Sequence, residues 1–104
     1  MKCKIDDLEY TIEEQGTGKY VYLNDFDESR LGICMMGKQR IMIHEDLSEA
    51  MKKLVLRHEL CHAFMFTRGF NDEQMSEEQV CDFMACVSPK IVDICEAYFN
   101  QRKG

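Results

Sequence analysis

One short run limits the fold more than any other part of the chain: His58-Glu59-Leu60-Cys61-His62, with two histidines four residues apart and a glutamate after the first. In an α-helix, residues four apart lie one turn above each other, so both imidazoles can bind one metal ion. Glu59 then lies beside them, close enough to take a proton from a water held by that ion. The run therefore predicts a helix with a zinc site, in which His58 and His62 are ligands and Glu59 is the catalytic base.

The residues around this motif have helical periodicity. Asp46 and Glu49 have the spacing of a capping box, which predicts the start of the helix. Arg68, Gly69 and Phe70 predict its end, with glycine in a left-handed conformation. Between these ends, apolar and motif residues recur three and four apart and predict one inward-facing stripe: Leu47, Met51, Leu54, His58, Cys61, His62 and Met65.

Two further helices are expected downstream. Ser76 and Gln79 form a second capping box, followed by apolar residues at helical spacing. We expect this helix to stop before Pro89, and a third helix to begin with Ser88 as its N-cap. The second half of the chain therefore predicts about three helices in total.

The first half reads as short strands separated by turns, from residue 5 to residue 44. The β-forming stretches are 20–23, 31–36 and 39–44, and Gly37-Lys38 suits a type II′ hairpin between the last two. We expect the strand Arg40–His44 to form the sheet edge beside the cleft, where a peptide could add as a further strand. The fold class is thus α+β: a small, mainly antiparallel sheet packed on about three helices, in one zincin-like domain over residues 1–104.

Composition narrows the function classes. A chain of 104 residues has room for one compact domain. The net charge of −6, without a basic cluster, argues against direct nucleic-acid binding. The sequence has no export signal and no run of about 18 uncharged apolar residues, so we expect a cytoplasmic protein that does not enter a membrane, with its six cysteines reduced.

A catalytic zinc normally has three protein ligands, so a third must lie downstream. Met65 and Arg68 occupy the positions where a metzincin has glycine and its last histidine, which excludes that class.

The acidic candidates on the following segment are Asp72, Glu73, Glu77, Glu78 and Asp82. Glu78 shares its helix face with small or polar residues and is the preferred ligand, with Glu77 as the alternative. Asp82, one turn on, could accept the remaining ring N–H of a ligating histidine. The two glutamates could instead serve only to complement the helix dipole.

These residues resemble a known family. The resemblance runs from Gly37–Ile43 through Leu47-Ser48 and His58–Ala63 to Glu78–Ala85, and the family is the ImmA/IrrE metallopeptidases, which have HExxHA followed by a helix of the form E-x-x-A-N/D-x-F-A. It implies a zinc ligand at Glu78 and the family's Asn/Asp at Asp82. It also implies that the substrate is a separate protein, for example a helix-turn-helix transcriptional repressor of a phage or mobile element.

Two functions from different classes therefore stand. The first is a zinc-dependent endopeptidase that hydrolyses a peptide bond in a protein partner, and the presence of Glu59 favours it because a structural site has no use for a base. The second is a non-catalytic, zinc-stabilised module that binds or regulates a partner, and the small size of the chain favours it. A fourth protein ligand such as Cys61 or Cys81 would favour the second function.

Overall fold

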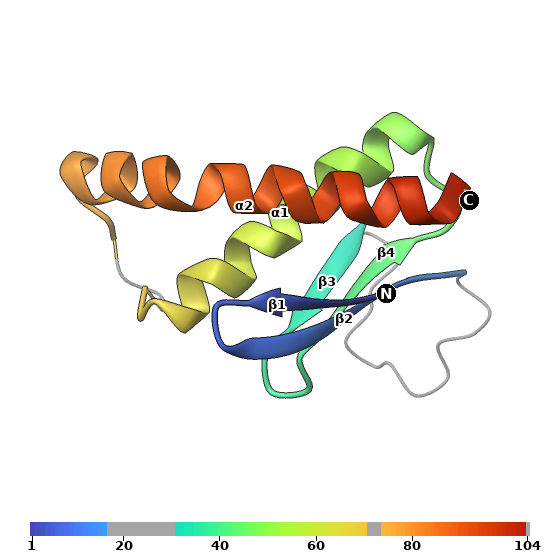
Figure 1. The fold of residues 1–104 in the computed structure, drawn as a ribbon, viewed down its shortest axis with the longest axis horizontal. Coiled ribbons are helices and arrows are strands. Elements are labelled where there is room, and N and C mark those ends of the chain that lie inside the picture. The colour runs from blue at the N-terminus through green and yellow to red at the C-terminus, as the bar shows by residue number, and fades with distance from the viewer. Residues whose placement is uncertain (17–30, 71–73, 104) are drawn as a thin grey trace.

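The computed structural model describes residues 1–16, 31–70 and 74–103 (Figure 1). The expected strand at 20–23 lies outside the described residues. Within them the elements are β1 (Lys2–Ile5), β2 (Leu8–Gln15), β3 (Gly32–Met35), β4 (Arg40–His44), α1 (Glu49–Thr67) and α2 (Glu77–Lys103). The fold class is α+β, as the sequence predicts.

The described strands form one sheet in the order β1-β2-β4-β3. The outer pairs are antiparallel, and β2 pairs with β4 in parallel, so the sheet is mainly antiparallel as predicted. The prediction that Arg40–His44 is an edge strand is wrong, because β4 is paired on both sides. Its residues Ile41, Met42 and Ile43 are all fully buried, as suits a central strand. Among the described strands, β3 is the edge on this side of the sheet.

The β3–β4 hairpin is confirmed, but its turn differs from the predicted one. The strands are joined by residues 36–39, and the Gln39 amide donates to the Met36 carbonyl at 3.2 Å. Gln39 has a φ of 53°, whereas Gly37 does not have the positive φ that the first residue of a type II′ loop requires. The left-handed residue therefore follows the turn instead of opening it.

Helix α1 begins later than the predicted capping box and ends as predicted. Ser48, not Asp46, is the N-cap, and its side chain accepts a hydrogen bond from the Met51 amide at 3.2 Å. At the other end, Gly69 has a φ of 82°, and the Phe70 amide donates to the Met65 carbonyl at 2.9 Å. This is the Schellman pattern expected from glycine after the last turn.

Helix α2 begins as predicted but is not interrupted. Ser76 and Gln79 exchange hydrogen bonds at 2.9 and 3.2 Å, which confirms the second capping box. Pro89 lies inside a continuous helix of 27 residues, so the predicted break is wrong and the described part of the chain has two helices. Val87 and Ile91 are buried on either side of the exposed Pro89, and packing of this stripe outweighs the lost backbone hydrogen bond. No described helix is long and apolar enough to cross a membrane.

The two helices cover one side of the sheet, with α1 packed against β3 and β4 and α2 lying across α1 (Figure 1). The core between these layers is apolar, with one ionic group at its margin. Lys52 of α1 lies 2.8 Å from a carboxylate oxygen of Glu14 on β2, and the Tyr98 hydroxyl of α2 donates to the same carboxylate at 2.7 Å. This group joins the sheet to both helices. The buried apolar residues of the core include Tyr10, Ile12, Ile41, Ile43, Leu56, Leu60, Phe64, Phe83, Val87 and Ile91.

A second polar contact holds the end of α1 to the β1–β2 turn. The Asp6 carboxylate accepts hydrogen bonds from the Thr67 hydroxyl at 2.5 Å and from the Arg68 guanidinium at 2.9 Å. Burial by itself raises the pKa of Asp6, but these two hydrogen bonds and the positive charge of Arg68 outweigh it and lower the pKa below its usual value. The ionised form of Asp6 therefore stabilises this junction.

Candidate active site

His58 and His62 lie together on α1, as their spacing predicts, but both are exposed. The predicted inward-facing stripe is therefore wrong at these two residues, and also at Leu54, which is 52% exposed. The Nε2 atoms of the two histidines are 3.2 Å apart, and the rings lie edge to face with centroids 4.8 Å apart. Both side chains belong to exposed residues, so the pair is open to solvent. The two nitrogens therefore lie next to each other at the surface of the helix.

The distance between these nitrogens fits a shared metal ion. Two ligands at a Zn–N distance of about 2.05 Å and a tetrahedral angle are about 3.3 Å apart, close to the separation in this structure. Two neutral rings can also approach this closely through one N–H···N hydrogen bond, with one ring as donor. The pair is therefore pre-positioned, and an ion could bind without a change of helix geometry.

Glu59 lies on the same turn of α1 but faces inward. It is only 8% exposed, between the helix and strand β3. The neighbouring strand comes unusually close because it has a glycine here: a Cβ on Gly32 would lie 2.5 Å from Cγ1 of Val55 and 3.3 Å from Cγ of Glu59. Gly32 thus allows β3 to pack directly against the turn of α1 that carries the motif.

A cavity of about 360 Å³ opens beside these three motif residues. Its other lining residues come from β3 and the following turn: Gly32, Ile33, Cys34 and Met36. Burial, with a further contribution from the charge of Glu59, raises the pKa of Cys34 to about 12, so its thiol is neutral near pH 7. The cavity therefore has a mainly apolar wall opposite a pair of imidazoles and one buried carboxylate.

Sequence reasoning did not identify this wall. Gly32 was available as a signal, because glycine inside a strand often marks a close approach of another backbone. Cys34 and Met36 carried no comparable signal. Their proximity to the motif depends on the order of the strands and on the packing of α1 across them.

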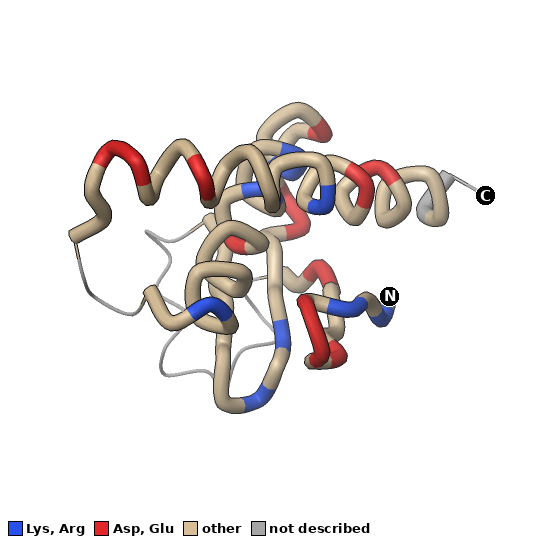
Figure 2. Tube along the Cα trace, turned by 60° about the vertical axis from the view of Figure 1, so that its left-hand side comes forward, with Lys and Arg blue, Asp and Glu red and all other residues tan. Residues whose placement is uncertain are grey.

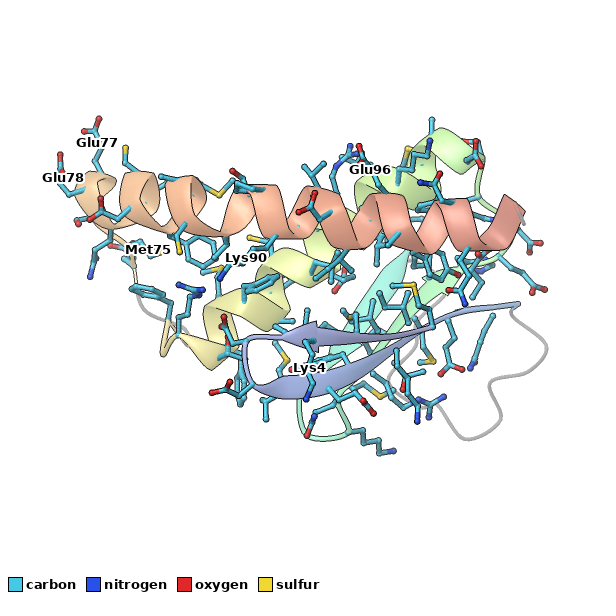
Figure 3. The ribbon with its side chains drawn as sticks, in the orientation of Figure 1. Lys4, Met75, Glu77, Glu78, Lys90 and Glu96 are labelled. Atoms are coloured by element: carbon cyan, nitrogen blue, oxygen red, sulfur yellow. The ribbon has the colours of Figure 1, made fainter. Side chains whose placement is uncertain are left out.

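The structure does not bring Glu78 to the histidine pair. Glu77 and Glu78 lie in the first turn of α2, both exposed, and Figure 3 shows them at the far end of that helix, directed away from the sheet. Among the described residues, no third His, Cys, Asp or Glu completes a metal-binding group with the pair. Acidic residues mark this end of α2 in Figure 2, where they complement the helix dipole. The assignment of Glu78 or Glu77 as a ligand stays a prediction.

Asp82 also lies away from the pair in this structure. It lines a separate cavity of about 240 Å³ together with Arg68, Phe70 and Cys86. Its predicted hydrogen bond to a ligating histidine is therefore not formed here, and that role stays a prediction as well.

The cysteines proposed as alternative ligands differ in exposure. Cys61 is half-buried and packs against the core, and burial raises its pKa, in keeping with the packing role expected for a free cysteine. Cys81 is exposed. Neither forms a metal-binding group with the histidines among the described residues.

Paired imidazoles and a buried glutamate on one helix, beside a cavity walled by β3, are the arrangement expected of a metallopeptidase-type domain. Comparison with known protein families agrees with this interpretation. The sequence model of one peptidase family, described as the IrrE N-terminal-like domain, matches residues 9–87. The chain belongs to this family, which confirms the resemblance recognised in the sequence. Comparison with curated proteins and with solved structures gave no match.

Proposed function

We propose that this chain is a zinc-dependent endopeptidase that hydrolyses a peptide bond in a protein partner. One observation carries the proposal: the Nε2 atoms of His58 and His62 lie 3.2 Å apart beside the buried Glu59, at an open cavity in a member of a peptidase family. In this proposal His58 and His62 hold zinc and Glu78 supplies the third ligand, with Glu77 as the alternative. Zinc, when bound, acts as a Lewis acid that polarises a carbonyl group and lowers the pKa of a coordinated water.

The residues of the chain itself supply base catalysis and substrate orientation. Glu59 accepts the proton of the attacking water on its carboxylate and later passes it to the leaving amine. Burial between α1 and β3 limits the rotamers of this carboxylate, and so holds it next to the histidine pair. Glu59 thus acts first as a base and then as an acid, which explains why a glutamate occupies this position.

Strand β3 offers a way to align the substrate. Among the described strands it pairs only with β4, so its outer backbone groups face the side of the sheet where the cavity opens. An extended peptide that adds to β3 would have its backbone fixed by hydrogen bonds beside Glu59. This proposal moves the predicted edge from Arg40–His44 to Gly32–Met35.

The protein partner is proposed to be a transcriptional repressor of the helix-turn-helix class, located in the cytoplasm with this chain. Support comes only from the family resemblance and from the acidic net charge of −6, which suits a basic partner. Direct contact with nucleic acid or a membrane is not part of the proposal.

The alternative is a non-catalytic zinc-stabilised module, which the short chain of 104 residues favours because it offers little surface to hold a substrate. A structural site would be closed by four protein ligands, whereas a catalytic site keeps one open position. X-ray absorption of the zinc-loaded protein counts these ligands. Nitrogen and oxygen neighbours only, with one from water, support the peptidase; a sulfur neighbour supports the module.

Metal content tests the proposed site. We expect one equivalent of zinc by mass spectrometry in the native chain, none in His62→Ala, and an unchanged amount in Glu59→Gln. Glu78→Gln should weaken zinc binding while Glu77→Gln, its neighbour in the same exposed turn, leaves it intact. No bound metal in the native chain after addition of zinc would overturn the proposal.

A further inference from the structure

The histidine pair belongs to a longer row of exposed residues on α1. Leu54 precedes His58 by four positions, and Phe66 follows His62 by four. Residues at this spacing form a continuous ridge along a helix. Leu54 is 52% exposed and Phe66 is 41% exposed, so a large apolar side chain stands in solvent at each end of the pair.

Exposed apolar side chains are ordinary where they are scattered singly. Leu54 and Phe66 differ from such scattered residues because they flank the histidine pair symmetrically, each the same number of residues from its centre. The rise of about 1.5 Å per residue puts each about 9 Å from that centre, and the two about 18 Å apart. The two histidines at the middle of the ridge line the cavity together with Gly32, Cys34 and Met36 of the β3 hairpin, and Leu54 and Phe66 lie beyond this lining along the helix.

An extended peptide matches these dimensions. It rises about 3.3 Å per residue, so side chains six positions apart point to the same face and lie about 20 Å apart. A helix of roughly 13 residues would also span about 20 Å, but its backbone groups are paired within the helix and cannot add to β3 as a further strand. The edge strand, the cavity and the ridge therefore fit a strand-like occupant.

We propose that Leu54 and Phe66 determine substrate specificity by contacting two apolar side chains of an extended peptide, one about three residues before the scissile bond and one about three residues after it. This inference rests on the proposed function for the place of the scissile bond. It names the substrate class: an extended segment with apolar residues on both sides of a short central stretch.

Peptide binding tests the inference without requiring cleavage. The probe is a fluorescein-labelled decapeptide of serine, threonine and alanine with two leucines six positions apart, and its control has the same composition with the leucines adjacent. Glu59→Gln protein with one equivalent of zinc is titrated and fluorescence anisotropy is recorded. We expect the spaced probe to bind about tenfold more tightly than the control probe.

Three variants in the Glu59→Gln background locate the contacts: Leu54→Gln, Phe66→Gln and Val92→Gln. Val92 is the matched control, since it is similarly exposed at 43% but lies on α2, outside the ridge. Glutamine has a good helix propensity, so each variant should fold, and circular dichroism confirms this. We expect Leu54→Gln and Phe66→Gln each to weaken binding of the spaced probe about tenfold, with Val92→Gln unchanged.

The outcomes separate this inference from the proposed function. Equal binding of both probes, or equal affinity of all three variants, overturns the inference even if the native chain cleaves peptides. Loss of binding only in Leu54→Gln and Phe66→Gln supports it even if the native chain cleaves nothing, in which case the peptidase proposal fails alone. Analytical ultracentrifugation would also overturn it if the native chain is a dimer and Leu54→Gln is a monomer, because the ridge would then be an interface between two copies of the chain.

Discussion

Replacement of Gly32 by alanine tests how closely β3 packs on the motif helix. The new Cβ would lie 2.5 Å from Cγ1 of Val55 and 3.1 Å from the Met42 carbonyl oxygen. Ordinary carbon–carbon contacts are about 3.5–4.0 Å, so the strand and the helix must separate by about 1 Å. Val55 is buried, with only 6% of its surface exposed, so its side chain is held by the surrounding core.

The magnitude follows from two opposing effects. Overpacking of this kind costs about 1–3 kcal/mol. Restriction of the unfolded chain by alanine offsets about 0.4–1 kcal/mol of this. A net loss of about 1–2 kcal/mol lowers the midpoint of thermal unfolding by roughly 4–15 °C for a domain of this size.

Gly37→Ala is the matched control, because a Cβ there meets nothing within 4 Å and the residue has no positive φ. Thermal unfolding followed by circular dichroism should show Gly32→Ala clearly below the native chain and Gly37→Ala equal to it or slightly above. In a Val55→Ala background, where the contacting methyl group is absent, Gly32→Ala should lower the midpoint by less than it does in the native chain. Equal midpoints for the two single glycine variants would refute the close packing of β3 on α1.

Three further predictions concern the rest of the molecule. Lys52→Met leaves the carboxylate of Glu14 buried without its cation and should cost about 3 kcal/mol in urea unfolding, and a loss below about 0.5 kcal/mol would contradict the buried pair. Iodoacetamide at pH 8 should modify the exposed Cys86 before Cys34, whose pKa is raised to about 12, and peptide mass spectrometry that finds Cys34 first would be inconsistent with this wall of the cavity. Folding lowers the pKa of Asp6, so ionised Asp6 stabilises the folded chain at pH values above its unfolded pKa, and this stabilisation is lost as the pH falls through its folded pKa. Asp6→Asn should therefore destabilise the chain at pH 7 and make little difference at pH 2. An equal loss of stability at both pH values would exclude the ionised contact.

Local signals in the sequence predicted the parts of the fold that local contacts determine. The glycine after α1 and the capping box before α2 each have the predicted hydrogen bonds. The spacing of His58 and His62 placed both imidazoles together because one turn of helix is enough to do so. Alternation of Cys3, Ile5, Leu8, Tyr10 and Ile12 with polar residues was a usable signal for β1 and β2, although these two strands were not predicted individually.

Features that depend on distant residues could not be read in this way. The central place of β4 results from its parallel pairing with β2, which no turn signal reports. Continuation of α2 through Pro89 results from packing of Val87 and Ile91 on the core, a tertiary effect that overrides a local helix breaker. The place of Glu78 depends on how α2 docks on α1, so its face on the helix was not sufficient to assign it to the histidine pair.

The central claim is that this chain hydrolyses peptides with Glu59 as the base. The most direct measurement is mass spectrometry of a mixed peptide library incubated with zinc-loaded native chain and, in parallel, with zinc-loaded Glu59→Gln. We predict new peptide termini with the native chain and a rate at least about 100-fold lower with the variant, at equal zinc content. No cleavage by the native chain, or equal cleavage by both proteins, would contradict the account.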